Sequence, residues 1–304
     1  MYDEMINHFP NIEILKNKKL SDYTWTKTGG IADMIAFPKT FEETESLLKY
    51  AKNKSISITI IGNASNLIIR DGGISGIVII LNKMDKVFVS GNDLTAEAGV
   101  AYIEATKVAQ QNNLSGLEFA AGIPGSVGGG VYMNAGAYGG ETKQVLKSVK
   151  VLNEKNEIQV LKHEDLNFGY RYSSLQDNHL TVLEATFSLI KKDGNLIQQE
   201  MDHLNHLRKS KQPLEYPSCG SVFKRPTGYF AGKLIHDSNL QGYRNGGAEV
   251  SKKHAGFIVN VDNATASDYL NVINHVQETV KNKFGVSLET EVRIIGNKSD
   301  SEGK

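Results

Sequence analysis

The stretch Gly122-Ile-Pro-Gly-Ser-Val-Gly-Gly-Gly-Val-Tyr-Met-Asn-Ala-Gly-Ala-Tyr-Gly-Gly140 holds eight glycines in nineteen residues. Glycine loses more backbone freedom on folding than any other residue, so this density indicates tight turns or a backbone that approaches another group closely. Pro124 stiffens the entry, and Ser126 can cap a short helix predicted over 127–133. A loop that leads into a helix N-terminus directs unpaired N–H groups at one point, which suits a phosphate or pyrophosphate. We therefore interpret the stretch as a cradle for a nucleotide cofactor.

A second small-residue turn supports this interpretation. Residues 61–66, Ile-Gly-Asn-Ala-Ser-Asn, follow an apolar run at 56–61 and precede Leu-Ile-Ile-Arg at 67–70, so the turn joins two predicted strands. Neither turn continues as a Walker loop, and neither reads GxGxxG between a strand and a helix. One such turn alone would more simply be a packed connection between elements. Two of them suggest a large cofactor with a diphosphate, held from two sides.

Composition excludes several classes of protein. The chain has 304 residues, of which 40% are hydrophobic and 22% charged, which is typical of globular proteins with about two domains. The formal net charge is zero, so bulk electrostatics recruit neither nucleic acid nor an anionic membrane. The first twenty residues carry six charges and no apolar core, and Cys219 is the single cysteine. We expect a cytoplasmic monomer with no metal site and no membrane or nucleic-acid partner.

The order of predicted elements indicates an α+β protein. Helices are expected over 40–52, 103–111, 195–211, 229–237 and 265–284, the first opened by a Thr40–Glu43 capping box and the last by a Thr-x-x-Asp cap. Strands are expected over 31–37, 56–61, 67–70, 76–81, 86–89, 94–98, 148–152, 157–161, 181–190, 256–261 and 287–295. A change in composition at 191–199 predicts two domains, residues 1–195 and 196–304.

Two further polar segments allow more than one interpretation when only their own residues are considered. Tyr170 and Arg171 lie together in a predicted loop, where packing plus a solvated charge is as good an interpretation as a binding role. Residues 208–226 place basic side chains, a hydroxyl and a thiol between three prolines. That segment is either a solvated loop or a binding site for an anionic substrate, and rigid loops with convergent polar groups modestly favour the site.

Taken together, the motifs resemble one family. The glycine-rich stretch is followed by Tyr-Arg-Tyr-Ser at 170–173, Gly-Ser-Val-Phe-Lys at 220–224, Ala-Gly-Lys-Leu-Ile at 231–235, Lys-His-Ala-Gly-Phe-Ile-Val-Asn at 253–260 and Glu-Val-Arg-Ile-Ile-Gly at 291–296. In this order and spacing they resemble the UDP-N-acetylenolpyruvoylglucosamine reductases over residues 25–296. Each motif alone is unspecific, but six in register are highly specific.

The resemblance implies a fold and a reaction. The fold would be a vanillyl-alcohol-oxidase (PCMH)-type FAD-binding domain followed by a smaller α+β substrate-binding domain. NADPH would reduce FAD, and reduced FAD would pass a hydride to the enolpyruvyl group of UDP-N-acetylglucosamine enolpyruvate, giving UDP-N-acetylmuramate for peptidoglycan. By position, Arg171 and Glu291 would stabilise the developing enolate, with Glu291 protonated or sharing a proton, and Ser221 would protonate C2. Because this reaction needs no covalent intermediate, we expect Cys219 to be a small apolar lining residue and not a nucleophile.

The resemblance also implies the binding residues. The substrate side comprises Tyr170, Lys211, Lys224, Arg225 and His254. The FAD side comprises Gly62, Asn63, Ala64, Ser65, Asn66, Leu67, Gly122, Ile123, Pro124, Gly125, Ser126, Gly128, Gly129, Asn134, Ala135 and Gly136.

The chain also departs from the family pattern. Ala64 stands where many relatives have glycine, Arg225 stands where asparagine is common, and the short connection from Tyr170 to the strand at 181 indicates the subtype without a tyrosine-bearing lid loop. A flavin oxidase of the same superfamily would usually attach FAD through a histidine, and neither glycine-rich turn contains one, so we expect non-covalent FAD. A non-catalytic flavin or sugar-nucleotide sensor could dispense with Arg171, Ser221 and Glu291.

Overall fold

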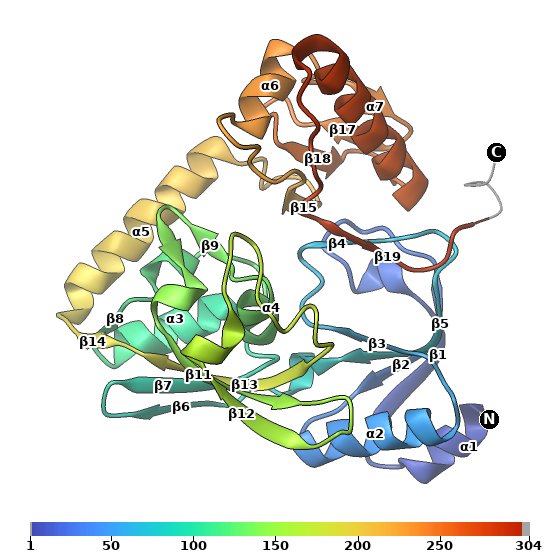
Figure 1. The fold of residues 1–304 in the computed structure, drawn as a ribbon, viewed down its shortest axis with the longest axis vertical. Coiled ribbons are helices and arrows are strands. Elements are labelled where there is room, and N and C mark those ends of the chain that lie inside the picture. Colours follow the sequence, from blue (N-terminus) through green and yellow to red (C-terminus); the bar gives the residue numbers. More distant parts are fainter. Residues whose placement is uncertain (1, 300–304) are drawn as a thin grey trace. The chain divides into compact units, whose positions relative to one another are not determined.

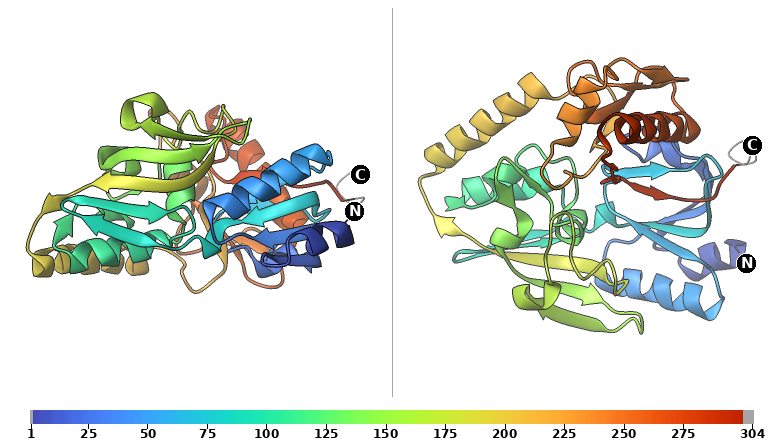
Figure 2. Two further views of the ribbon diagram at one scale, coloured as in Figure 1. Left: turned by 90° about the horizontal axis from the view of Figure 1, so that it is seen from below. Right: turned by 45° about the horizontal axis from the view of Figure 1, so that its top comes forward.

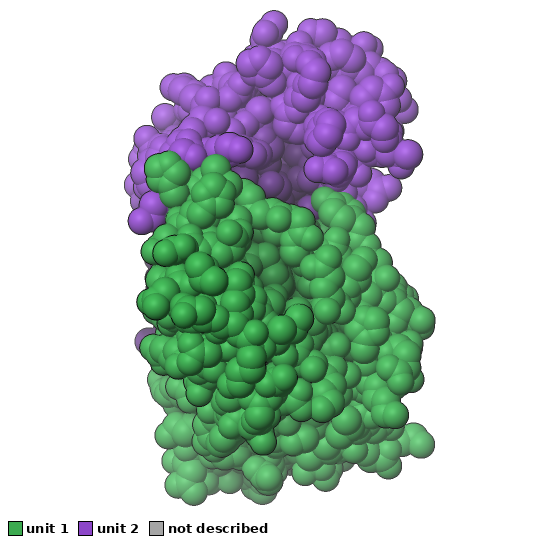
Figure 3. Space-filling model, turned by 90° about the vertical axis from the view of Figure 1, so that its left-hand side faces the viewer, with its two compact units in different colours: residues 1–16, 34–63, 76–208 green, residues 17–33, 64–75, 209–304 purple. Residues whose placement is uncertain are grey.

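The computed structural model describes residues 2–299. The chain forms two compact units, each with a hydrophobic core of its own. Unit 1 comprises residues 1–16, 34–63 and 76–208, and unit 2 comprises residues 17–33, 64–75 and 209–304 (Figure 3). Two early segments are thus grouped with the C-terminal part of the chain, a discontinuity that the predicted division at 195/196 does not include.

A four-stranded sheet has the order β1-β2-β5-β3, in which β3 and β5 are parallel (Figure 1). Its strands are β1 (Glu13–Lys19), β2 (Ile31–Phe37), β3 (Ile58–Ile61) and β5 (Ile74–Ile80), and the nearby helices are α1 (Tyr2–His8) and α2 (Phe41–Asn53). The sequence analysis missed β1, because Glu-Ile-Leu-Lys-Asn-Lys-Lys carries no clear alternation. Its charges suit its place at the edge of the sheet, where lysines discourage pairing with other chains.

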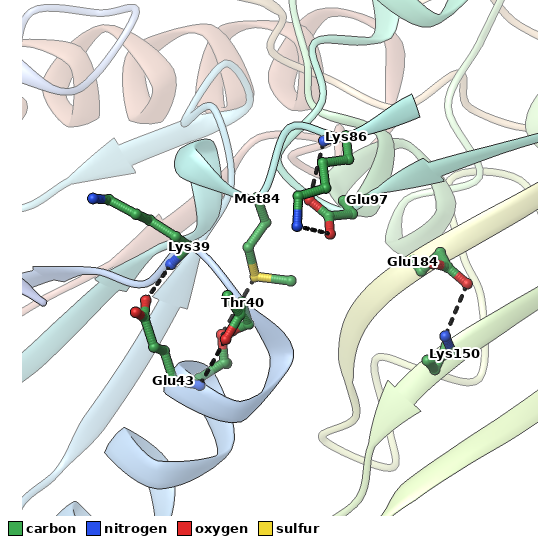
Figure 4. Close-up of polar contacts among 9 residues, drawn as sticks. Lys39, Thr40, Glu43, Met84, Lys86, Glu97, Lys150 and Glu184 are labelled. Atoms are coloured by element: carbon green, nitrogen blue, oxygen red, sulfur yellow. Dashed lines mark hydrogen bonds and ion pairs between the residues drawn. The ribbon is translucent and has the colours of Figure 1, made fainter. Parts of the chain in front are cut away.

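The first turn of α2 begins as its sequence predicts. The Thr40 hydroxyl oxygen accepts a hydrogen bond from the backbone N–H of Glu43 at 3.2 Å. The Glu43 carboxylate, however, accepts from the backbone N–H of Lys39 at 2.6 Å, one residue earlier than a capping box requires (Figure 4). The Thr44 hydroxyl then contacts the Met84 sulfur at 3.3 Å, which ties this turn to the segment after β5.

A five-stranded antiparallel sheet lies in unit 1, with the order β12-β11-β13-β7-β6. Its strands are β6 (Val87–Ser90), β7 (Asp93–Glu97), β11 (Leu146–Leu152), β12 (Ile158–Lys162) and β13 (Thr181–Ser188), and α3 (Tyr102–Gln111) and α4 (Val127–Tyr132) pack near it. The ring of Tyr102 is fully buried and stacks on Phe187 of β13 with centroids 6.0 Å apart. Its hydroxyl lies 2.9 Å from the Thr142 hydroxyl, so this polar group is satisfied inside the core.

Two short strand pairs and one long helix complete unit 1. They are the pair β8 (Leu114–Ser115) and β14 (Ile190–Lys191), the hairpin β9 (Gly136–Ala137) and β10 (Gly140–Glu141), and the helix α5 (Gly194–Lys211), whose last three residues belong to unit 2. The Gly122–Gly140 stretch therefore contains α4 and β9 and is built around the buried Tyr102.

Unit 2 has a four-stranded sheet with the order β15-β18-β17-β16. Its elements are β15 (Ser218–Ser221), β16 (Arg244–Asn245), β17 (Ala248–Val250), β18 (Phe257–Asn260), α6 (Ala231–Asp237) and α7 (Ala266–Phe284). α7 packs against β16 and β17 and is the long red helix in the right-hand view of Figure 2. A parallel pair of β4 (Leu67–Ile69) and β19 (Arg293–Ile295) joins residues far apart in the sequence.

Local signals set both ends of α7. The Thr265 hydroxyl accepts from the Asp268 N–H, the Asp268 carboxylate accepts from the Thr265 N–H, and Gly285 ends the helix with φ of 69°. The Asp71 carboxylate adds hydrogen bonds to the N–H groups of Ala266 and Ser267, both at 2.8 Å. This helix is confirmed as predicted, whereas the predicted strand over 287–295 is a strand only at 293–295.

Candidate active site

The small-residue turn Gly62–Leu67 leaves β3 and enters β4, so the two predicted strands are confirmed but lie in different sheets. Ala64 has a left-handed φ of 46°, which costs an ordinary residue about 1–2 kcal/mol. Within residues 2–299, the N–H groups of Asn63, Ala64 and Ser65 donate no hydrogen bond to the protein. Consecutive N–H groups around a left-handed residue form an anion-binding concavity. This turn therefore has the donors that a pyrophosphate needs.

The glycine-rich stretch around Ser126 uses its N–H donors differently from our expectation. Ser126 caps α4, as predicted. The amides that follow it donate within the protein, Val127 to Val100 O at 2.8 Å, Gly128 to Ala98 O at 2.9 Å and Gly129 to Ser126 Oγ at 3.3 Å. The expected free N–H groups are absent at these three positions, because the carbonyls of Ala98 and Val100, just after β7, and the hydroxyl of Ser126 accept from them.

Close packing explains part of the glycine content here. A β carbon on Gly130 would lie 2.5 Å from the Tyr102 ring, and one on Gly128 would lie 2.8 Å from the Ala98 β carbon. The two turns also meet inside unit 1. The Asn63 side chain donates to the Pro124 carbonyl at 2.6 Å, and the Ser126 hydroxyl occupies the space of a β carbon on Gly62. The residues predicted to hold a diphosphate from two sides are thus brought together.

Asn134 links the far end of the glycine-rich stretch to the segment that carries Arg171. Its buried side-chain amide donates to the Glu141 carboxylate at 2.9 Å and to the Gly169 carbonyl at 2.8 Å. Its side-chain oxygen accepts from the Lys143 N–H at 3.0 Å. Both amide hydrogens are used within the protein, so the side chain acts as a structural bridge, and the predicted contact of Asn134, Ala135 and Gly136 with a cofactor remains a prediction.

Arg171 lies in a tight turn in which Gly169 and Tyr172 exchange backbone hydrogen bonds of 3.0 and 3.3 Å. Its φ of 55° is rare for a bulky residue and is the kind of strain found at functional sites. The guanidinium donates to the Gly136 carbonyl at 3.0 Å and lies 5.1 Å from the centre of the Tyr170 ring. Unit 1 therefore fixes the orientation of this cation beside β9.

Ser221 and Glu291 start from neighbouring backbone positions in unit 2. Ser221 ends β15 and is exposed, after Gly220 at a φ of 77°. The backbone N–H of Glu291 donates to the Val222 carbonyl at 2.7 Å. The Asn66 side chain donates to the Glu291 carbonyl at 3.2 Å, so the end of the Gly62–Leu67 turn is joined to the predicted catalytic glutamate.

His254 lies beside Ser221. The position of a β carbon on Gly256 would be 3.1 Å from the His254 ring and 4.0 Å from the Ser221 hydroxyl oxygen. His254 Nδ1 accepts from the Gly256 N–H at 3.2 Å, and burial lowers the pKa of the imidazole below its usual value. At neutral pH the ring is therefore neutral and carries its proton on Nε2, where it can donate to a ligand.

The other substrate-side residues are arranged as follows. Lys211 ends α5 and is exposed, and half of the Tyr170 side chain is exposed. Lys224 forms an ion pair with Glu289, in which Nζ lies 3.4 Å from the carboxylate oxygen Oε2. The exposed Arg225 lies 4.6 Å from the centre of the Phe230 ring, which is 60% exposed. A guanidinium on an exposed ring is a common recognition surface for planar or anionic ligands.

Cys219 is buried, and this burial raises the pKa of its thiol to about 12. The group is therefore a neutral thiol at any working pH, without the thiolate that a nucleophile needs. A neutral thiol agrees with the prediction that Cys219 does not react, and its place in the lining of the site stays a prediction.

Arg208 and Tyr138 were missed by the sequence analysis. Arg208 Nη1 donates to the Gly122 carbonyl at 2.6 Å, and the guanidinium lies 5.8 Å from the centre of the Tyr138 ring. Tyr138 has a φ of 53°. Nothing in the sequence shows that a residue 86 positions after Gly122 reaches it.

The residues of the Gly62–Leu67 turn fit a dinucleotide with a pyrophosphate, on the ground of the free N–H donors at 63–65. The described residues contain no group of three or more His, Cys, Asp or Glu side chains placed to hold a metal ion. No helix in that part of the chain is long and apolar enough to cross a membrane.

Comparisons with known proteins agree with this geometry. A family model described as "FAD binding domain" matches residues 32–162, and one described as "UDP-N-acetylenolpyruvoylglucosamine reductase, C-terminal domain" matches residues 212–295. The UDP-N-acetylenolpyruvoylglucosamine reductase of Limosilactobacillus fermentum is 59% identical over 297 residues, covering 98% of this chain and 99% of that protein. The protein of the same name from Listeria innocua is 54% identical over 288 residues, covering 95% and 97%.

A solved structure is also similar. The crystal structure of UDP-N-acetylenolpyruvylglucosamine reductase from Thermus caldophilus matches with a TM-score of 0.80 at 33% identity, covering 93% of this chain and 98% of that one. With the two family models, this likeness confirms the predicted fold class, an FAD-binding domain of the vanillyl-alcohol-oxidase type followed by a smaller α+β domain.

Proposed function

The chain belongs to the UDP-N-acetylenolpyruvoylglucosamine reductase family, and from that membership we propose that it reduces the enolpyruvyl group of UDP-N-acetylglucosamine enolpyruvate to UDP-N-acetylmuramate. NADPH is the reductant, FAD is the cofactor, and the product serves peptidoglycan biosynthesis. The observation that carries the proposal is 59% identity to a reductase over almost the full length of both chains.

Arg171 is assigned to the substrate carboxylate. When bound, FAD would supply the hydride chemistry between NADPH and C3 of the enolpyruvyl group. Hydride addition drives negative charge onto C2 and the carboxylate, so a fixed cation there stabilises the transition state more than the ground state. A guanidinium is charged at any working pH and binds a carboxylate with two parallel hydrogen bonds. The contacts of Arg171 with Gly136 and Tyr170 support this role, because they orient its side chain in advance.

Ser221 is assigned as the donor of a proton to C2, and Glu291 as the group that stabilises the enolate by sharing a proton with it. A serine hydroxyl is a weak acid, but it can serve where the acceptor is a strongly basic, carbanion-like carbon. The exposure of Ser221 and the hydrogen bond from the Glu291 N–H to the Val222 carbonyl at 2.7 Å support these roles, since both side chains leave adjacent backbone.

The remaining substrate residues are assigned to the UDP-sugar. The resemblance places Lys211, Lys224 and Arg225 on the substrate side, and their positive charge suits the diphosphate of the UDP-sugar. Arg225 stands where the family commonly has asparagine, and its guanidinium lies on the ring of Phe230. His254 offers a neutral Nε2–H, because burial lowers the pKa of its imidazole. Tyr170 lies next to Arg171 and lines the approach to the carboxylate.

The alternatives are less well supported. A flavin oxidase of the superfamily usually carries FAD on a histidine, and residues 62–67 and 122–140 contain no histidine. A non-catalytic sensor would not require Arg171, Ser221 and Glu291 together. A cytoplasmic location suits a chain that uses NADPH and a UDP-sugar and has one buried, free cysteine. For its oligomeric state we propose a monomer.

A spectroscopic test decides the function. The purified protein should be yellow, NADPH should bleach the flavin band under anaerobic conditions, and UDP-N-acetylglucosamine enolpyruvate should restore it with formation of UDP-N-acetylmuramate. UDP-N-acetylglucosamine, which lacks the enolpyruvyl group, is the matched control and should leave the flavin reduced. Restoration by oxygen alone at the same rate would identify an oxidase, and a flavin that NADPH does not bleach would contradict the proposal.

A further inference from the structure

Arg208 packs against the first residue of the glycine-rich stretch. Its Nη1 donates to the Gly122 carbonyl at 2.6 Å, and its Nε and Cδ would lie 2.6 and 2.8 Å from a β carbon on Gly122. Any side chain at position 122 would displace the guanidinium. Gly122 is therefore a glycine because an arginine from the C-terminal end of α5 occupies the space beside it.

This guanidinium is largely buried without an opposite charge. Among residues 2–299, no carboxylate forms an ion pair with Arg208, whose partners are the Gly122 carbonyl and the ring of Tyr138. Loss of water lowers the pKa of the guanidinium, although an arginine stays charged at any working pH. A buried charge without a counter-ion is unfavourable, so the arrangement suits an anionic group that arrives with a ligand.

The surroundings of Arg208 indicate which anion this is. The pyrophosphate of FAD already has donors in the free N–H groups at 63–65. Arg208 instead lies beside Tyr138, a residue with a left-handed φ of 53° and a ring that is 40% exposed. An exposed aromatic ring beside an arginine fork suits a flat, conjugated partner that becomes negative.

The isoalloxazine ring of FAD has this property. A hydride brings two electrons and one proton to a neutral ring and leaves NADP⁺, so the reduced ring carries one net negative charge unless it takes a second proton from solvent. We propose that Arg208 is the counter-ion of the reduced isoalloxazine ring, and that Tyr138 lines the same position. The inference rests on the FAD-dependent function proposed above.

Protein charges near the ring tune the reduction potential of a flavin. The cation should therefore bind reduced FAD more tightly than oxidised FAD and raise the midpoint potential. The variants to compare are Arg208→Gln, which removes the charge, Arg208→Lys, which keeps it, and Lys107→Gln, which removes an exposed charge from α3 of the same unit. The midpoint potential is measured by equilibration with a reference dye, and the Kd of oxidised FAD by titration of the apoprotein.

In Arg208→Gln we expect the affinity for reduced FAD to fall at least tenfold more than that for oxidised FAD, a decrease of about 30 mV or more in the two-electron potential. Arg208→Lys should shift the affinity ratio by less than about threefold, and Lys107→Gln should leave it unchanged. If Arg208→Gln lowers the affinities for reduced and oxidised FAD equally, the arginine binds the pyrophosphate or only stabilises the loop at Gly122. That result would overturn the proposal.

A second measurement uses the unmodified holoenzyme and does not depend on the folding of a variant. After anaerobic reduction, the flavin spectrum is followed as the pH is lowered. A counter-ion keeps the reduced ring anionic at a pH where free reduced FAD is already protonated, and protonation at the same pH as free reduced FAD would overturn the proposal. This measurement needs only bound FAD. If the reduced flavin is protonated like free FAD while turnover is normal, the counter-ion proposal fails and the proposed function stands. Absence of bound FAD would refute both the counter-ion proposal and the proposed function.

Discussion

The hydroxyl of Ser126 occupies the space that a side chain on Gly62 would need, so these two residues join the two turns of unit 1 at one point. Once that hydroxyl is removed, the next nearest atom to a β carbon on Gly62 is the Ser126 β carbon at 3.4 Å, an ordinary contact. The pair can therefore be tested as a unit.

We expect Gly62→Ala to lower the free energy of unfolding by about 1–3 kcal/mol, the usual cost of overpacking, and to weaken FAD binding. In a Ser126→Ala background the same change should cost clearly less, because the overlapping atom is gone. Urea unfolding and FAD titration of both single variants and the double variant form a mutant cycle. Strictly additive effects would show that the two residues do not meet.

Ser221→Ala should separate the two half-reactions. Flavin reduction by NADPH does not use the proton donor, so its rate should stay within a few fold of the unsubstituted enzyme. Reoxidation by the enolpyruvyl sugar nucleotide should fall about 10²–10⁴-fold, the usual contribution of a positioned general acid, with little change in substrate affinity. Stopped-flow flavin absorbance measures both steps, and Ser218→Ala on the same strand is the control. Equal slowing of both steps would make Ser221 structural, and no slowing would place the proton donor elsewhere.

Cys219→Ala should keep turnover within about threefold, since burial raises the thiol pKa to about 12 and leaves no thiolate to react. Alkylation of the native protein by iodoacetamide at pH 8 should be slow and should accelerate in urea. A thousandfold loss of turnover with FAD still bound would contradict the assignment of this residue as a lining group.

FAD should leave the protein on acid precipitation, because the proposed contacts are hydrogen bonds and no histidine lies in either turn. The yellow colour is expected in the supernatant and should show the spectrum and mass of unmodified FAD. Colour that remains in the washed pellet would demonstrate a covalent link.

Because of His254, the free energy of unfolding should decrease as the pH falls. Burial holds the pKa of this imidazole below its unfolded value of about 6.5, so the unfolded chain takes up the proton first. The contribution of the neutral ring to stability is complete above that value and decreases below it, by at most about 1.4 kcal/mol per pH unit. His254→Gln should therefore lose less unfolding free energy between pH 7 and pH 5, measured in urea, than the exposed control His206→Gln. Parallel curves would show that His254 is solvated.

The sequence predicts local features well and long-range ones poorly. The Ser126 and Thr265 caps and the turn at 62–66 depend on neighbouring residues, and the structure contains them. The amides at 127 and 128 are paired with the carbonyls of Val100 and Ala98, just after β7, and no local pattern reveals this contact. The contact of Arg208 with Gly122 is likewise non-local. The roles of the catalytic residues came from the family resemblance, because a lone serine or glutamate carries no such signal.

The pairing of β4 with β19 has a consequence for synthesis on the ribosome. β4 leaves the Gly62–Leu67 turn early in the chain, yet its partner strand is Arg293–Ile295, and the Arg293 N–H donates to the Asn66 carbonyl at 3.1 Å. Most of unit 1 can fold while later residues are still being made, since chains fold from the N-terminal side during translation. Unit 2 must wait for residue 295 before β4 is paired. The nascent chain therefore holds an unfinished Gly62–Leu67 turn for most of its synthesis, and translation of the last strand sets the time at which that turn reaches its final geometry.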